Sequence, residues 1–368
     1  MTANSASSGR PEDVQICLVG GVGKSGTTVV REIFNKHPLV ATFPTETRFL
    51  IDPDGLVDFY DAACAGWSPY VYDMKLWRLE RLLRDVGRPE FAGGRGRPTS
   101  AIHVRERPSP MQDAIGRVRE RLKASPLLPR YFNVSLEKSC PEYPRLVDEL
   151  ISSLVSFHFN GRWTGFPPLR PSKIFAGAPE DAQQIATSLG TFFRRVMAAR
   201  AASSDATHVV EDSPFNHISF DRTLKLIPEA RLVHVHRDPR DVVASLTKVV
   251  WAPSDPVTAA RLCYKIMREW DRVKALLPPQ SFTEVSVESL SENPEPTLRK
   301  LCDFWGLPWA DELLDLDVSL VNSGRWKSDL DDSAQLQVTE LLKTDLTAYG
   351  YEPEEHVRSR ASERSDAR

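Results

Sequence analysis

The sequence lacks the features that define several large classes of protein. Its five cysteines are odd in number, widely spaced and never in a CxxC pair, which argues against a disulfide framework or a zinc site. The formal net charge is only −3, which argues against a general binder of nucleic acid or membrane surfaces. No apolar run exceeds the length of a strand, so we expect no membrane-spanning helix. Any anion-binding site must therefore be local.

The two ends of the chain also lack hydrophobic character. The first residues, "MTANSASSGRPEDVQ", contain no apolar stretch of the kind that a secretory signal requires. We predict disordered tails at 1–12 and 353–368, because both are polar and charged. Together with the pattern of reduced thiols, these features favour a cytoplasmic protein.

Between the tails the composition is that of a globular protein, with 41% hydrophobic and 26% charged residues. Short apolar runs alternate with amphipathic segments, which predicts one α/β domain over 13–352. In it a parallel central sheet is flanked by helices, as in P-loop NTPases, and a helical insertion occupies 54–180. The expected strands are 14–21, 39–44, 207–212, 231–237 and 282–290. The expected helices in the insertion include 74–87 and 143–159.

The stretch "GGVGKSGTT" (20–28) follows the first expected strand and opens a helix. A strand, a glycine-rich turn and a helix start place backbone N–H groups and the helix dipole around an anion. Lys24 adds a positive charge, and Ser25, Thr27 and Thr28 add hydroxyl donors. The strict Walker pattern needs a glycine where this chain has Leu18. The alternative is a plain glycine turn with Lys24 in solvent.

A second segment, "RLVHVHRDPRDVVASL" (231–246), places Arg237 at the end of a strand and Ser245 eight residues later on the next helix. An arginine fork can clamp a phosphate there, and the serine can donate to the same oxygens. The phosphates of an ordinary nucleoside triphosphate form one chain and need no second site. A nucleotide with phosphate at both ends of its ribose does need one.

The ordered pair "GKSGTT" and "RDPRDVVAS" resembles the PAPS-dependent sulfotransferases, over about 14–50 and 206–330. The resemblance implies PAPS as the donor, PAP as the product, and no metal. It places Arg237 and Ser245 on the 3′-phosphate. The late segment "VNSGRWKSDL" (321–330) is similar to the family's "GRW" segment and brings Arg325, Trp326 and Lys327 near the nucleotide. The resemblance implies these contacts with the 5′ end: Gly23, Lys24, Ser25, Gly26, Thr27 and Thr28.

Sulfuryl transfer needs a cation on the leaving phosphate and a group that takes the acceptor's proton. Lys24 suits the first role. For the second, "FPTETRFLID" (43–52) resembles the tyrosylprotein sulfotransferases of the Golgi and related bacterial enzymes, in which a Glu-Thr-Arg follows the phosphate loop. That resemblance makes Glu46 the base, with Arg48 beside the substrate. The alternative is a solvated glutamate paired locally with Arg48.

The chain departs from the family at two positions. Many relatives carry a lysine where this chain has Asp212, so one cation is missing or is supplied by Lys327 or Arg48. Asp212 could instead orient the acceptor hydroxyl or share the task of the base. The tyrosine that often precedes Glu288 is Val287 here, which removes one expected contact.

The favoured function is transfer of a sulfuryl group from PAPS to a hydroxyl of a small-molecule, carbohydrate or lipid-linked acceptor bound by the 54–180 insertion. Two alternatives stay open. One is a P-loop kinase or NTPase, in which Asp212 would hold a metal ion. The other is a PAP-binding regulator without catalysis. His234 and His236 alternate on a strand as metal ligands could, but no third ligand is spaced to join them, so we expect packed histidines.

Overall fold

The structure is a computed structural model of the chain, and it describes residues 14–88, 134–164, 172–177, 182–315 and 323–353. The predicted tails at 1–12 and 353–368 lie outside these ranges, apart from residue 353. So does most of the expected loop between 88 and 110. Within the described residues, no helix combines the length and the apolar character that crossing a bilayer requires.

Five parallel strands form the central sheet, in the order β2-β5-β1-β6-β7. All five strands predicted from the sequence are present and pair in parallel, although the last ends at Ser286 rather than at residue 290. Because parallel strands end at a common edge, the loops after β1, β2, β5 and β6 all meet there. The strands are β1 (Gln15–Gly20), β2 (Val40–Thr42), β5 (His208–Glu211), β6 (Arg231–His236) and β7 (Phe282–Ser286).

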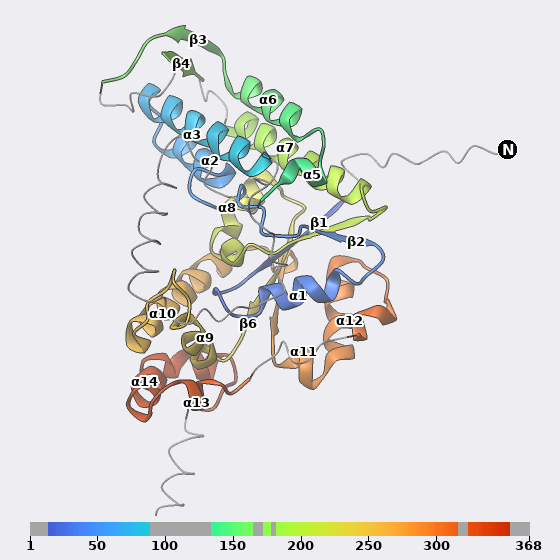
Figure 1. The fold of residues 1–368 in the computed structure, drawn as a ribbon, viewed down its shortest axis with the longest axis vertical. Coiled ribbons are helices and arrows are strands. Elements are labelled where there is room, and N and C mark those ends of the chain that lie inside the picture. The colour runs from blue at the N-terminus through green and yellow to red at the C-terminus, as the bar shows by residue number, and fades with distance from the viewer. Residues whose placement is uncertain (1–13, 89–133, 165–171, 178–181, 316–322, 354–368) are drawn as a thin grey trace, which may run out of the picture.

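Both faces of this sheet are buried by helices, as the continuous apolar strands predict. Alternate residues of β1 face opposite sides: Ile16 and Leu18 belong to one hydrophobic core, and Cys17 and Val19 to another. Figure 1 shows the helices above and below the strands. The Cys17 side is covered by α1 (Thr27–Phe34) and α12 (Pro294–Trp305), and the Leu18 side by α7 (Ala182–Ala202), α8 (Phe220–Leu226) and α10 (Pro256–Lys274).

The insertion is helical, as predicted, but it also contains a hairpin that the sequence analysis missed. The expected helix at 143–159 ends early, at Leu154, and a strand follows it. The segment "FHFN" holds two aromatic residues, which favour extended backbone over helix. The described elements here are α2 (Leu56–Ala65), α3 (Pro69–Gly87), α5 (Leu136–Ser139), α6 (Tyr143–Leu154), β3 (Phe157–Asn160) and β4 (Lys173–Ala176), the last two antiparallel.

The last part of the chain forms a third core beside the sheet edge. Here α9 (Pro239–Leu246), α10, α13 (Trp326–Asp329) and α14 (Asp332–Ala348) share buried apolar side chains. The short α11 (Ser289–Glu292) connects β7 to α12. Turns of 3-10 helix complete the described elements at Pro214–Ser219, Pro279–Ser281 and Asp311–Leu314. Figure 1 shows α13 and α14 beside α9 and α10. The C-terminal segment reaches the end of β6, where the Tyr349 ring lies 4.6 Å from that of His236.

Candidate active site

The loop between β1 and α1 has the compact backbone that a phosphate cradle needs. Lys24 and Gly26 both have positive φ angles, 78° and 107°, so the chain turns sharply before the helix. A Cβ atom on Gly21 would lie 2.3 Å from the carbonyl oxygen of Val235. One on Gly26 would lie 2.7 Å from Cγ2 of Val287. The glycines therefore let the loop pack against the ends of β6 and β7.

Two side chains of this loop are available to an anion. Among the described residues, the Lys24 ammonium makes no hydrogen bond or ion pair, and burial lowers its pKa. The Ser25 side chain is buried at 1% exposure, and its Oγ has no partner in the described part of the chain. Buried polar atoms in proteins are nearly always hydrogen-bonded, so this hydroxyl fits a loop built for a ligand. Thr27 and Thr28 open α1 directly after the loop.

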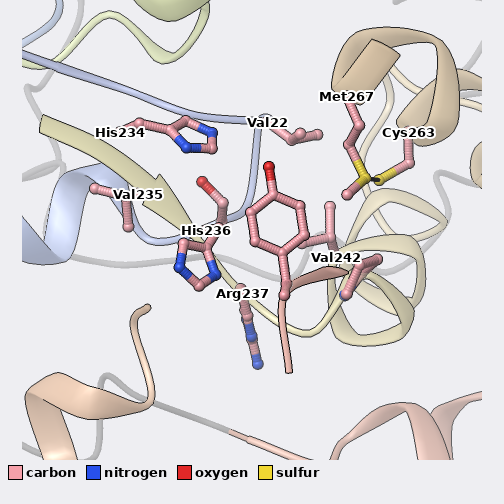
Figure 2. A pocket seen from close by; sticks show the side chains of 11 residues that line it. Val22, His234, Val235, His236, Arg237, Val242, Cys263 and Met267 are labelled. Carbon is pink, nitrogen blue, oxygen red and sulfur yellow. Dashed lines mark hydrogen bonds between the residues drawn. The ribbon is translucent and has the colours of Figure 1, made fainter. Parts of the chain in front are cut away.

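The second predicted phosphate residue lies on the same crevice. Ser25 and Arg237 both line it, together with His236 and Tyr349. Figure 2 shows Arg237 at the end of β6, pointing away from His234. Its Nη2 lies 3.4 Å from Oδ2 of Asp241, one turn into α9. The two motifs of the sequence analysis are therefore brought together at one sheet edge, although Ser245 is not among the residues that line the crevice.

The "GRW" segment is tied to the arginine through Asp241. This fully buried carboxylate accepts hydrogen bonds from the backbone N–H groups of Gly324 and Trp326, at 2.7 and 2.9 Å. Burial raises the pKa of Asp241, while Arg237 and the two N–H groups oppose that rise. Trp326 is 2% exposed and packs 4.1 Å from the guanidinium of Arg240. Because its ring is buried, Trp326 contributes to the packing that supports this segment.

Arg325 caps α13 at its N-terminus, and Lys327 lies on this helix. Arg325 is 3.3 Å from Asp329, and its side chain is 40% exposed. Lys327 lies over the Trp326 ring at 5.8 Å. Asp329 also pairs with Lys248, which follows α9. Arg325 and Lys327 are therefore anchored near α9, on the side of the molecule that carries Arg237.

The candidate base lies in the loop after β2. A carboxylate oxygen of Glu46 pairs with Arg48, which itself has a positive φ of 65°. The local pairing that the sequence left open is thus present. The Glu46 side chain is nonetheless only 25% exposed. Burial raises its pKa; Arg48 acts against the rise, and the neighbouring carboxylates of Glu211 and Asp52 add to it. A carboxylate with a raised pKa accepts a proton more readily near neutral pH.

Asp212 lies just after β5 and is 2% exposed. Burial raises the pKa of this carboxyl to about 7, against the opposing charge of Arg31 and with further contributions from Glu211 and Glu46. The Nε of Arg31 lies 3.5 Å from its Oδ2. The cation beside Asp212 is therefore Arg31, which the sequence analysis did not consider. The available signal was its position on α1, one turn after Thr27 and on the same buried side.

A tyrosine from the C-terminal segment contacts Glu288. Tyr351 donates a hydrogen bond from its hydroxyl to Oε2 of Glu288, at 2.9 Å. The other oxygen, Oε1, accepts from the backbone N–H of Asp238, 3.0 Å away, and Asp238 caps α9. Val287 provides no tyrosine, as the sequence analysis noted, but one arrives from a distant part of the chain. No local signal links position 351 to 288, so the sequence could not reveal this contact.

His234 is a packed side chain, as predicted from the sequence, whereas His236 is half-buried and lines the crevice. His234 is 3% exposed, and its Nδ1 lies 3.0 Å from Glu284. The rings continue toward Tyr349, whose centroid lies 4.6 Å from that of His236. Within the described ranges, no group of three His, Cys, Asp or Glu residues is arranged to hold a metal ion.

Comparison with known proteins finds one family that the middle part of the chain resembles. The sequence pattern described as "Sulfotransferase family" matches residues 141–311, a little under half of the chain. This segment contains β5, β6, Arg237 and Ser245. This part of the chain is therefore similar to the sulfotransferase family, in agreement with the resemblance that the two motifs carry.

Individual relatives are distant. An uncharacterized protein of Aquifex aeolicus (strain VF5) is 27% identical over 129 residues, which is 32% of this chain and 16% of that protein. The chain thus matches less than two thirds of that relative's length.

Solved sulfotransferase structures resemble the chain in outline. The sulfotransferase domain of the Synechococcus PCC 7002 olefin synthase has a TM-score of 0.43 and 15% identity, over 92% of this chain and 94% of that one. The sulfotransferase STF9 of Mycobacterium avium has a TM-score of 0.42 and 13% identity, over 92% of this chain and 78% of that one.

Proposed function

We propose that the protein transfers a sulfuryl group from PAPS to a hydroxyl of an acceptor, giving a sulfate ester and PAP. One observation carries the proposal: the phosphate loop and Arg237 lie on a single crevice, where Ser25 has a buried hydroxyl without a partner in the described chain. Two anion-binding elements in one crevice suit a nucleotide with phosphates at both its 5′ and 3′ positions.

The chain's residues divide between the two ends of that nucleotide. The loop residues Gly23 to Thr28, with Lys24 and Ser25 foremost, would hold the 5′ end. Arg237 and Ser245 would hold the 3′-phosphate, and Asp241 keeps Arg237 and the 324–326 segment together. Arg325 and Lys327 would add positive charge nearby. PAPS supplies the activated sulfuryl group, so the protein's task is to bind, orient and move a proton.

The proton transfer falls to Glu46. Its carboxylate takes the proton of the acceptor hydroxyl as that oxygen bonds to sulfur and the bond from sulfur to the phosphate oxygen breaks. Lys24 neutralises the charge that develops on the departing phosphate. Because burial raises the pKa of Glu46, transfer should rise with pH as this carboxyl loses its proton. Arg48 and Asp212 would lie beside the acceptor.

We infer an acceptor that is a small molecule, a carbohydrate or a lipid-linked intermediate. The cytoplasm is the proposed location, with which five free cysteines are consistent. A kinase or NTPase would use Asp212 as a metal ligand. The pairing of Asp212 with Arg31, and a pKa raised to about 7, argue against that use.

Calorimetry with PAP, and separately with ATP and Mg²⁺, tests the donor assignment. We expect micromolar PAP binding that weakens roughly 100-fold in Arg237→Ala, because a charge-assisted bond to phosphate is lost. The matched control is Arg231→Ala, which removes an exposed arginine from the opposite end of the same strand. Equal or tighter binding of ATP with Mg²⁺ would contradict the proposal.

Incubation of the protein with radiolabelled PAPS and cell extract tests the chemistry. Label in an extract fraction, absent without protein, supports transfer and leads to the acceptor. PAP binding without any labelled product would favour the regulator without catalysis, as would a Glu46→Ala variant with unchanged cellular effect.

A further inference from the structure

The loop that carries Glu46 is held from one side by the helix of the phosphate loop. Arg31, on α1, is 5% exposed. Its Nη1 donates to the carbonyl oxygens of Phe43 and Pro44, at 3.3 and 3.4 Å. Its Nε faces Asp212 at 3.5 Å. One guanidinium thus joins α1, the end of β5 and the two residues that begin the Glu46 loop.

From the other side the same loop is held by Glu211, the last residue of β5. This carboxylate is 1% exposed. Its Oε1 accepts from the backbone N–H and the hydroxyl of Thr47, at 3.3 and 3.1 Å. Oε1 also accepts from the hydroxyl of Ser213. The other oxygen, Oε2, accepts from the backbone N–H of Ser213 and from Nδ2 of Asn216. Asn216 in turn donates to the carbonyl oxygen of Val19, on β1.

These contacts leave Glu46 between two fixed points. Residues 43 and 44 are bound to Arg31, and Thr47 is bound to Glu211. A buried charge is costly unless it is fully hydrogen-bonded. Packing alone would not require a charged side chain at position 31 or at position 211. Each charge bonds to the backbone of the Glu46 loop, and its remaining bonds go to other groups: Arg31 to Asp212 and Glu32, and Glu211 to Ser213 and Asn216. The fixed points also connect that loop to β1 and α1, the elements on either side of the phosphate loop.

We propose that Arg31 and Glu211 are positioning residues that set the place of Glu46 relative to the phosphate loop. The inference rests on the proposed function, because it takes Glu46 as the base. Neither residue needs to touch the donor or the acceptor. A displacement of a catalytic group by about 1 Å can reduce turnover roughly 100-fold, so a rigid connection between base and loop has a direct kinetic effect.

The first experiment measures the loop without any ligand. Amide hydrogen exchange is followed by NMR in the wild type, Glu211→Gln, Arg31→Lys and a control. Gln keeps the shape of Glu211 but turns an N–H₂ group toward donors, and Lys keeps the charge of Arg31 without its fork. The control is Lys36→Gln, which breaks an exposed ion pair with Asp315 at 3.1 Å just beyond α1.

We expect the Thr47 amide to exchange at least tenfold faster in Glu211→Gln, with the control unchanged. Unchanged amide exchange of residues 43–49 in both Glu211→Gln and Arg31→Lys would overturn the inference. If Glu211→Gln does not fold, Thr47→Val removes one of the bonds to Glu211 with little change of shape.

The second experiment measures sulfuryl transfer from radiolabelled PAPS to the acceptor in the cell-extract fraction that takes up label from the wild-type protein. We expect both variants to lower kcat roughly 10- to 100-fold, with PAP affinity within threefold of wild type. The double variant Glu46→Gln with Glu211→Gln should be no slower than Glu46→Gln alone, because Glu211 acts through Glu46. The inference would be overturned, with the proposed function intact, by either of two results. One is a double variant whose loss of kcat is the product of the two single losses. The other is wild-type kcat in a variant whose Glu46 loop shows faster amide exchange.

The failure of the proposed function gives a different result. Wild-type transfer activity in Glu46→Gln would show that Glu46 is not the base. Arg31 and Glu211 would then have no role in catalysis through it. Absence of transfer by the wild type would remove the chemistry itself. In both cases the amide exchange still reports whether Arg31 and Glu211 hold the loop, so the two failures can be told apart.

Discussion

Single residues decide whether the phosphate loop can form at all. Gly26 has a φ of 107°, in the region that side chains with a Cβ rarely adopt. It also lies against Val287, so a Cβ would come within 2.7 Å of that side chain. Conformation and space therefore both require glycine here. The loop is held in shape by its neighbours on β6 and β7 as much as by its own sequence.

We predict that Gly26→Ala destabilises the protein by about 1–3 kcal/mol, because it adds backbone strain and a steric overlap. Urea unfolding measures the loss, and calorimetry measures the accompanying loss of PAP affinity. The control is Gly66→Ala, since a Cβ there would meet nothing within 4 Å. Equal stability of the two variants would show that the loop adapts to a side chain.

At the scale of elements, the regular part of the fold could be predicted from the sequence. The strands of the sheet are short segments rich in apolar and β-branched residues, β1 (QICLVG) most clearly, and helices follow them along the chain. Lys24, Ser25 and Arg237 could be identified because they follow such strands directly. The carboxyl ends of parallel strands meet, and this geometry brings distant motifs together without any knowledge of side-chain packing.

What the sequence could not provide depends on contacts between distant segments. In the sequence, Arg31 has the pattern of any charged residue on an amphipathic helix. Its pairing with Asp212 becomes visible only in the fold, where the end of β5 lies beside α1. Tyr351 reaches Glu288 only because α14 packs on α9 and α10. The sequence pattern predicts helix as far as residue 159, although β3 begins at Phe157, because a short apolar segment fits both periods and its partner strand β4 is distant in the sequence.

One such contact gives a prediction about α9. Asp241 accepts two backbone N–H groups from the 324–326 segment and faces Arg237. Asp241→Asn would turn an N–H₂ group toward one of those donors, at a cost of about 1–3 kcal/mol. We therefore expect faster amide exchange at Gly324 and Trp326, and weaker PAP binding.

Asp329→Asn serves as the control for that change. It alters the ion pairs of Asp329 with Arg325 and Lys248 but leaves the Asp241 contacts in place. Unchanged exchange at positions 324 and 326 in Asp241→Asn would mean that the segment is held by packing of Trp326 alone.

For the whole molecule, a row of buried and half-buried rings joins the sheet to the C-terminal segment. His217, His234 and His236 follow one another, with ring centroids 5.1 and 6.2 Å apart, and Tyr349 continues the row. Burial lowers the pKa of all three histidines, that of His236 to about 4. They are therefore neutral in the folded protein at neutral pH.

This row sets the direction in which stability changes with pH. A histidine with a lowered folded pKa binds its proton more readily when the chain is unfolded. The unfolded state therefore gains protons first as the pH falls below the ordinary value of 6.5, and stability falls until the folded pKa is reached. For His236 the loss between neutral pH and pH 5 is about 2 kcal/mol. Asp212, whose pKa is raised, acts in the opposite direction: its contribution to stability is complete below its ordinary value of 3.8 and is lost as the pH rises through about 7.

We predict that His236→Phe flattens the acid limb of the stability curve. Urea unfolding at intervals from pH 4.5 to 7.5 should show a smaller decline for this variant than for the wild type, by about 2 kcal/mol at pH 5. The effect of Asp212 is common to both proteins and cancels in the difference between them. His158→Phe is the control, because His158 is exposed on β3 and its loss should leave the slope unchanged. An identical decline in all three proteins would mean that the ring row takes up protons without disturbing the C-terminal segment, and that the acid sensitivity of the fold originates elsewhere.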